Sequence, residues 1–204
     1  MRILLGLLLL VGVALLGIGA VLHPMLDGSA ADQLRLIAAT PYWRAIHLTM
    51  LAGSACLITG LWIRHVDKTF TPPLTIIAIG LALNAFDIGV MASAGTQMAT
   101  AFVAGNTAMA TVYEATHLIG VMTARFGNGL VALGALLLGW AEWTTTPRQP
   151  VLATLAWLAA VGGLVGALAF DETSRAILSA VTLICGWSVT TAVLTLRTGS
   201  RSLH

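Results

Sequence analysis

Charge is what this chain lacks most. Of its 204 residues, 9% are Asp, Glu, Lys or Arg, whereas 58% are hydrophobic. Soluble domains carry about 25% charged residues, so this composition leaves too little polar surface for a soluble fold. The net charge of +2 gives no basic surface that would bind nucleic acid. The sequence therefore predicts an integral membrane protein in contact with the lipid bilayer, without a nucleic-acid partner.

Cysteine is also scarce, and motifs of hydrolytic catalysis are absent. Cys56 and Cys185 both fall inside apolar runs, a position typical of small buried side chains rather than of a disulfide. The sequence contains neither HExxH nor G-x-S-x-G, the motifs of zinc proteases and of α/β-hydrolases. Any functional site must therefore consist of isolated polar residues rather than a known motif.

Long apolar runs are what the chain has instead. A membrane-spanning helix needs about 20 apolar residues. Six runs approach or reach that length, at roughly 3–22, 44–64, 73–97, 110–140, 151–170 and 174–196. The first run has some features of a signal peptide, but it is nearly long enough to span and five more runs follow it, so we interpret it as an uncleaved helix. The sequence predicts an all-α, six-helix membrane bundle that forms a single domain over residues 1–204.

Basic residues at the ends of the runs predict the orientation. One set of ends carries Arg2, Arg64, Lys68, Arg148, Arg197 and Arg201. The other set has fewer basic residues, diluted by acidic ones such as Asp27 and Asp32. By the positive-inside rule, the first set is cytoplasmic. We expect a multi-pass protein of the cell inner (plasma) membrane with both termini inside, and a short surface helix at 30–39 in the outer loop, ended by Pro41.

Ionisable residues at membrane depth usually mark a site because they are costly there. His47 lies one turn into the second run, and Asp87 lies about 15 Å below the outer end of the third at 1.5 Å per residue. Glu114 and His117 lie in the first turns of the fourth run, and Arg125 lies two turns deeper. We expect these side chains to meet in one polar pocket in the outer half of the membrane.

The fourth run complicates the depth of these residues. At roughly 46 Å it exceeds the hydrocarbon core of about 30 Å. It must tilt, kink at 127–129 (Gly-Asn-Gly), or extend beyond the core.

Each polar residue also has a structural interpretation. Asp87 and Arg125 would form a buried ion pair, and His47 would be a hydrogen-bonded interfacial residue. Glu114 would complement the positive end of its helix, and His23 would cap a loop.

The first functional hypothesis is haem b. Two histidines at matched height on two helices can ligate the iron axially, and His47 and His117 satisfy this requirement. Glu114 would tune His117, and Arg125 would compensate the propionate charge.

The surroundings of the two histidines extend this hypothesis. Arg44 is a second candidate to pair with a propionate, and Gly53 and Gly120 would leave space for the porphyrin.

Two resemblances bear on this hypothesis. Glu114 and His117 resemble the Glu-x-x-His helix of haem A synthases, which implies a haem pocket, although Leu118 stands where that family has Arg. Residues 23–53, with His23-Pro24, Trp43 and His47, resemble an uncharacterised family of small prokaryotic multi-pass proteins, which implies no activity.

The second hypothesis is a single Zn or Fe ion held by His47, Asp87, Glu114 and His117. Such an ion would serve redox chemistry or activate water in a membrane hydrolase. The third hypothesis has no cofactor. The polar groups would then form a structural network, a proton path or a small-solute pocket in a carrier or accessory protein.

Cofactor binding for redox or electron transfer is the function that the sequence favours. The sequence does not decide between haem and metal, and it does not identify the substrate, the redox partner or the oligomeric state.

Overall fold

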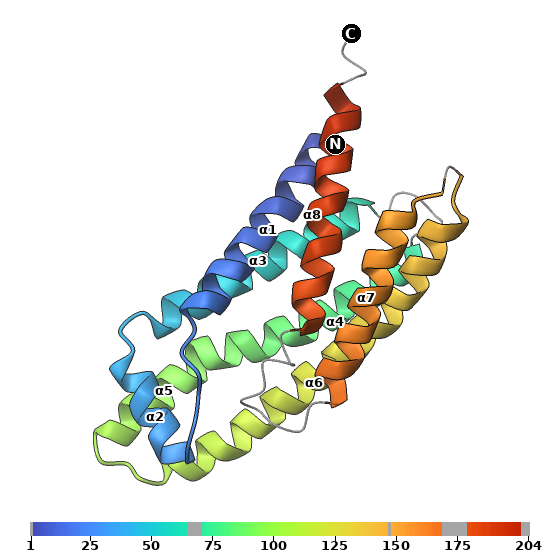
Figure 1. Cartoon of the computed structure of the whole chain (residues 1–204). Helices are drawn as coiled ribbons and strands as arrows, with labels where there is room; N and C mark the ends of the chain where they lie inside the picture. Colours follow the sequence, from blue (N-terminus) through green and yellow to red (C-terminus); the bar gives the residue numbers. More distant parts are fainter. Residues whose placement is uncertain (1, 65–70, 147, 169–178, 201–204) are drawn as a thin grey trace.

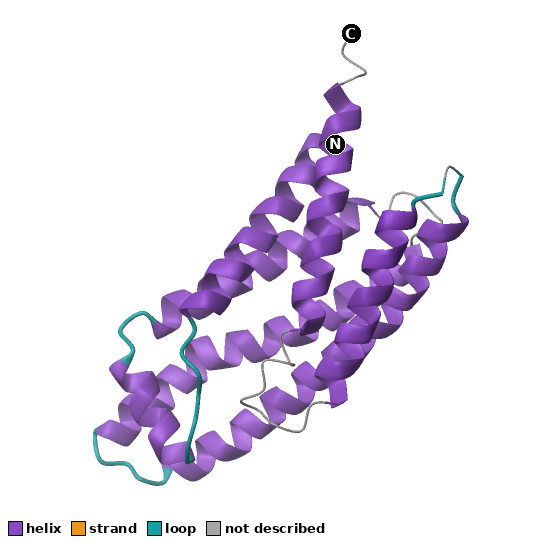
Figure 2. Ribbon diagram, in the orientation of Figure 1, coloured by secondary structure: helices purple, strands orange, loops and turns teal. Residues whose placement is uncertain are grey.

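The computed structural model describes residues 2–64, 71–146, 148–168 and 179–200, and within these ranges the chain is almost entirely helical without any strand (Figure 2). The predicted all-α bundle is confirmed. The elements are α1 (Arg2–Leu22), α2 (Ala30–Ala39), α3 (Trp43–Arg64), α4 (Thr71–Val90), the π-helical turn η2 (Met91–Gly95), α5 (Thr96–Val103), α6 (Met109–Thr144), α7 (Pro150–Leu168) and α8 (Ser179–Ser200).

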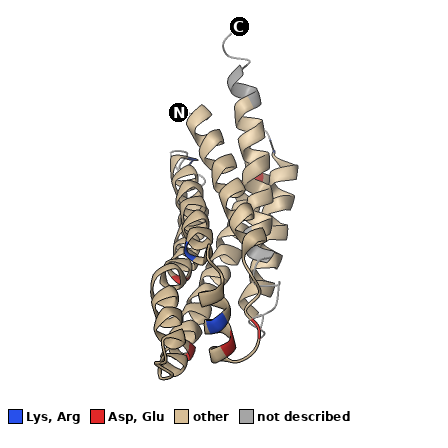
Figure 3. Ribbon diagram, turned by 90° about the vertical axis from the view of Figure 1, so that its left-hand side faces the viewer, with Lys and Arg blue, Asp and Glu red and all other residues tan. Residues whose placement is uncertain are grey.

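Six long helices form a closed ring. Each packs against two neighbours, in the order α1, α3, α4, α6, α7, α8 and back to α1 (Figure 1). Buried Leu, Ile, Ala and Trp side chains from these helices make one core inside the ring. Few charged residues lie along the helices (Figure 3), as expected of surfaces that face lipid.

Five helices in the described ranges are long and apolar enough to cross a membrane, which makes the chain a multi-pass membrane protein by length and composition. The predicted sixth span, 174–196, begins outside the described residues, and the apolar part of α8 that was searched is the shorter stretch Thr182–Leu196. The presence of six membrane-spanning helices therefore stays a prediction.

Two segments are much longer than a membrane requires. Residues 71–103 are helical throughout α4, η2 and α5, and α6 runs for 36 residues without a break. The helix is therefore not interrupted at 127–129, and its 36 residues correspond to a length of about 54 Å. The segments extend toward the end of the bundle where α2 lies (Figure 1), which we call the α2 end.

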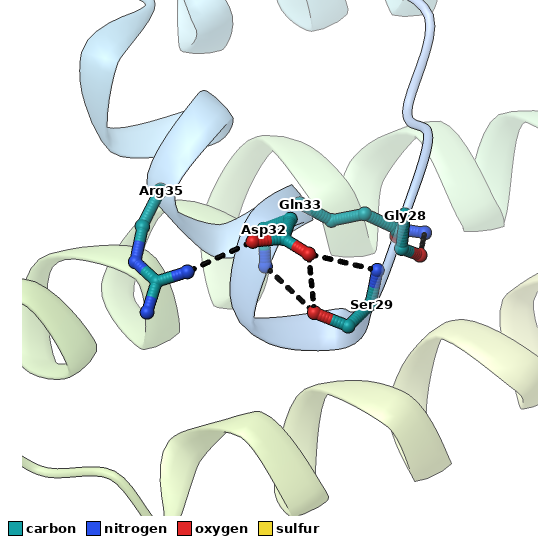
Figure 4. A network of polar contacts seen from close by, with 5 residues as sticks. All are labelled: Gly28, Ser29, Asp32, Gln33 and Arg35. Carbon is teal, nitrogen blue, oxygen red and sulfur yellow. Dashed lines mark hydrogen bonds and ion pairs between the residues drawn. The ribbon is translucent and has the colours of Figure 1, made fainter.

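The short helix α2 forms where the sequence predicts it. Ser29 caps its first turn in a capping box, in which the Ser29 hydroxyl accepts from the Asp32 amide and the Asp32 carboxylate accepts from the Ser29 amide (Figure 4). The Ser29 hydroxyl also donates to the Asp32 carboxylate, and these bonds lower the pKa of Asp32. Gly28 precedes the cap with φ +84°, a left-handed conformation that favours glycine. The amphipathic helix then packs on α5 and α6.

Glycines allow the long helices to approach closely. A Cβ atom at Gly80 of α4 would lie 2.6 Å from the Gly127 carbonyl oxygen of α6. A Cβ atom at Gly53 of α3 would lie 2.8 Å from the Leu16 amide nitrogen of α1. These backbone contacts are typical of membrane helices joined through small residues.

Candidate ligand-binding cavity

A partly open cavity of about 590 Å³ lies between the helices of the ring. Its walls come from α1, α3, α4, α6 and α8, so helices from both ends of the sequence contribute. Most lining side chains are apolar, and the polar exceptions are Ser54, Asn84, Asp87, Thr182 and Cys185. Cavities of this size, mainly apolar with a few polar groups, are typical of small-molecule sites.

Asp87 is the acidic residue of this cavity. Its carboxylate packs against Gly120 of α6, because a Cβ atom at Gly120 would overlap the carboxylate. Its Oδ1 atom is buried without a hydrogen-bond partner. A carboxyl group removed from water without a partner is unfavourable in an apolar wall, so Asp87 is the polar group of the cavity most in need of one.

The neighbouring polar groups have already used their donors. The Asn84 amide nitrogen donates to the Gly80 carbonyl at 3.0 Å and to Asn128 Oδ1 at 3.4 Å. The Ser54 hydroxyl donates to the Met50 carbonyl at 3.1 Å. Because these donors are engaged within the protein, Asn84 and Ser54 offer an occupant oxygen atoms that can accept.

His47 lies near the cavity but does not line it. Its side chain is 3% exposed, and its Nδ1 atom lies 2.9 Å from the Trp43 carbonyl oxygen one turn earlier. The rings of His23 and Trp43 pack on it, with centroids 5.0 Å and 4.3 Å away. The interpretation of His47 as a hydrogen-bonded residue is confirmed, and its nearest imidazole in this cluster belongs to His23.

Trp43 holds this cluster to α4. Its indole nitrogen donates to the Met91 carbonyl at 3.1 Å, in a buried contact between α3 and η2. Met91 begins the π-helical turn, where the regular hydrogen-bond ladder changes register. The anchor sets the position of the first turn of α3, and with it the position of His47.

The burial of His23 has an electrostatic consequence. The residue follows α1, and its ring packs on Trp43 at 4.9 Å. Removal from water lowers the pKa of His23 below the ordinary 6.5, opposed by a weaker effect of its backbone hydrogen bond with Pro24. His23 is therefore part of a packed aromatic cluster and not only a loop residue.

The side chains of Glu114 and His117 of α6 lie in different surroundings. Glu114 is exposed, whereas His117 is half-buried and stacks on Tyr113, with centroids 5.3 Å apart and an interplanar angle of 9°. The Tyr113 hydroxyl donates to the Gln33 side chain of α2 at 2.9 Å. The histidine of this pair therefore belongs to the contact between α6 and α2.

Arg125 does not pair with Asp87. Within the described residues the ion pairs are Arg35 with Asp32 and Arg64 with Glu142. The Nε atom of Arg125 is buried without a hydrogen-bond partner, and its terminal nitrogen lies 4.0 Å from the Met122 sulfur. The expected Asp87–Arg125 ion pair is therefore wrong, and neither Arg125 nor His117 lines the cavity.

The space expected for a porphyrin beside Gly53 and Gly120 is filled. The backbone of α1 closes the first position, and the Asp87 carboxylate covers the second. That expectation is therefore wrong at both glycines. Arg44, the other candidate for a propionate, is exposed.

The four predicted metal ligands are not gathered in this structure. Among the residues described, no three His, Cys, Asp or Glu side chains form a group that could hold a metal ion. His47, Asp87, Glu114 and His117 are all among the described residues, so the proposed ligand set is not assembled.

A partly buried ion pair at the opposite end of the bundle was not predicted from the sequence. Arg64 of α3 donates to Glu142 of α6 at 2.7 Å, and Glu142 is 1% exposed. The Arg64 guanidinium also lies 5.3 Å from the Trp187 ring centroid of α8. Glu142 stands between Trp140 and Trp143 in the sequence, and an acid near a helix end gives no sign of the partner across the ring.

Most of the cavity was also not predicted from the sequence. Asn84 and Ser54 lie inside apolar runs, and their position on the cavity depends on how the helices pack. The available signal was the spacing of Asn84 and Asp87, which at i and i+3 share one face of α4.

Comparisons with known proteins found no relative of this chain. No family model, no curated protein and no solved structure matches the chain.

Proposed function

We propose that the protein binds a small lipid-soluble molecule in the cavity inside its helical ring. One observation supports this above all: a mainly apolar space of about 590 Å³ has an acid without a hydrogen-bond partner in its wall. An apolar ligand would gain from leaving water, at about 25 cal/mol per Å² of buried surface. The polar group at Asp87 would fix its orientation. This is the small-solute pocket of a carrier or accessory protein, with α4 as its polar wall.

Two glycines make the proposal testable. Gly17 of α1 and Gly186 of α8 line the cavity, and a Cβ atom at either would meet nothing within 4 Å. The Cβ atom of a phenylalanine at either position therefore meets no neighbour, and we expect its ring to occupy part of the cavity. Gly89 of α4 is equally open but does not line the cavity, so Gly89→Phe is a matched control.

The experiment measures the fluorescence of N-phenyl-1-naphthylamine, an uncharged lipophilic dye, with the full chain in phosphatidylcholine nanodiscs. We expect saturable binding to the wild type and to Gly89→Phe, and a loss of about tenfold or more in Gly17→Phe and Gly186→Phe, because a buried ring replaces apolar ligand surface. Equal binding by all four proteins would overturn the proposal.

Haem b remains a second candidate function because of one contact. The His47 Nδ1 atom bonds to its own helix, an arrangement that orients a histidine and leaves Nε2 for a metal. In this hypothesis His47 and His117 would hold the haem, and the group would supply electron transfer to a redox partner. An absorption spectrum of protein from haem-supplied cells tests it. A Soret band lost in both His47→Ala and His117→Ala would support the hypothesis, and a featureless visible spectrum would refute it.

For the orientation, we infer that the termini lie in the cytoplasm and that the α2 end faces outward across the cell inner membrane. The distribution of basic residues supports this. Reporter fusions at the C-terminus test it, since alkaline phosphatase is active only outside and a fluorescent protein folds inside.

A further inference from the structure

The chemistry of the cavity wall restricts the ligand further, and this step rests on the proposed function. An occupant meets oxygen atoms, since the donors of Asn84 and Ser54 are bonded within the protein. The Thr182 hydroxyl and the Cys185 thiol are the other polar groups of the lining, and a thiol is a weak donor. Among Ser54, Asn84 and Asp87 the free capacity is therefore for accepting hydrogen bonds.

Asp87 also restricts the charge of the ligand. No hydrogen bond or ion pair joins its carboxylate to the described residues, and its Oδ1 atom is buried. Among the residues that the structure describes, the lining contains no Lys, Arg or His. A carboxylate in such a wall needs a proton or a cation, and none of the described lining residues supplies a cation.

We infer that the cavity takes a lipophilic amine, whose ammonium group donates to the Asp87 carboxylate while its apolar body fills the space between α1, α3 and α8. An ammonium group carries both the positive charge that the Asp87 carboxylate needs and the hydrogen-bond donors that the oxygen atoms of Asn84 and Ser54 can accept. Among Ser54, Asn84 and Asp87, an occupant that only accepts, such as a quinone, would find a free donor only in a protonated Asp87.

The position of Asp87 fits this role. The residue is in the middle of the continuous helical segment 71–103 and is held against the Gly120 backbone, so its carboxylate has a firm support on α6. The apolar lining residues Val13, Leu16, Ile88 and Val189 leave room for a hydrocarbon body beside it. The amine is either a free lipophilic base or the ammonium of an ethanolamine lipid, since both present the same head group.

The test compares three twelve-carbon competitors for the bound dye in phosphatidylcholine nanodiscs. Dodecylamine is a charged donor, 1-dodecanol a neutral donor and 2-dodecanone an acceptor. We expect dodecylamine to displace the dye from the wild type at a concentration about tenfold or more below that of dodecanone, the difference made by a charge-assisted hydrogen bond. Comparison between variants removes the contribution of partitioning into lipid.

Three variants locate the effect. In Asp87→Asn the preference for the amine should disappear while the dye still binds, and in Asp87→Glu part of it should return because the carboxylate is retained. Asp27→Asn removes an exposed acid outside the cavity and should keep the full preference. A parallel titration with phosphatidylethanolamine identifies a lipid source if it displaces the dye and this depends on Asp87.

The outcomes separate the two proposals. If dodecanone competes as well as the amine, or if Asp87→Asn leaves the amine preference intact, the amine proposal is overturned although the cavity still binds the dye. If the dye is not excluded by Gly17→Phe, the proposed function itself is overturned.

Discussion

Glu142 is a buried acid of this bundle and Asp87 a half-buried one, and they differ in whether a cation pairs with them. Glu142 is paired with Arg64 at 2.7 Å, and the guanidinium also lies over Trp187. Asp87 lines a cavity and has no such partner. A paired acid joins the helices that carry the pair, whereas an unpaired acid adds nothing to the fold that would offset its removal from water. We therefore assign Glu142 to structure and Asp87 to ligand binding.

Removal of the paired acid should have the largest effect. Glu142→Ala removes the carboxylate that pairs with the half-buried Arg64 guanidinium, and we expect a loss of about 3 kcal/mol in the free energy of unfolding. Unfolding by SDS in mixed micelles measures it. In the double variant Arg64→Met/Glu142→Leu most of the loss should be recovered, and an additive double loss would contradict a pairwise interaction.

A methyl group beside the unpaired acid should have a smaller effect. Gly120→Ala places a Cβ where the Asp87 carboxylate lies, so the side chain must move, at a cost of about 1 to 3 kcal/mol. The same unfolding experiment checks it. In the double variant Gly120→Ala/Asp87→Ala the cost should shrink, because the clashing carboxylate is absent; an unchanged cost would assign the strain to the backbone instead.

Substitution of the unpaired acid itself should hardly change stability. Asp87→Asn breaks no hydrogen bond or ion pair within the described residues, so we expect a change within about 0.5 kcal/mol in ligand-free protein. A loss comparable to that of Glu142→Ala would show that Asp87 is structural, and the contrast between the two acids would fail.

Substitution of His23 should have the smallest effect on stability, and it should have this effect only at mildly acidic pH. Because burial lowers the pKa of His23 below 6.5, the unfolded chain binds a proton before the folded chain does. Stability therefore falls as the pH drops below 6.5, until the folded-state pKa is passed. His23→Phe, which retains a ring beside Trp43, should lose part of this dependence. Thermal unfolding between pH 7 and about pH 5 measures it, and an identical pH profile in the variant would contradict it.

The fold was largely predictable because its signals are local. Long apolar runs indicate membrane helices, and Ser29 and Asp32 at the start of 30–39 indicate a capped helix. The length of α6 was also visible, although its continuity through 127–129 was not, because packing between helices supports glycine there. The first residues of the last predicted span lie outside the described ranges.

The site was predictable only in part. The rarity of ionisable residues in apolar runs pointed to Asp87 and His47, and both are buried or half-buried as expected. Their partners were assigned wrongly because rotation of each helix about its axis is set by contacts between helices. Gly120 thus faces Asp87, Trp43 reaches Met91, and Arg125 does not line the cavity.

Native mass spectrometry of protein purified from membranes tests the central claim most directly, because it needs no prior choice of ligand. We predict a bound small molecule in the wild type and in Gly89→Phe that is absent from Gly17→Phe and Gly186→Phe, and reduced in Asp87→Asn. The same bound species in all five proteins, or none in the wild type, would contradict a ligand in the cavity.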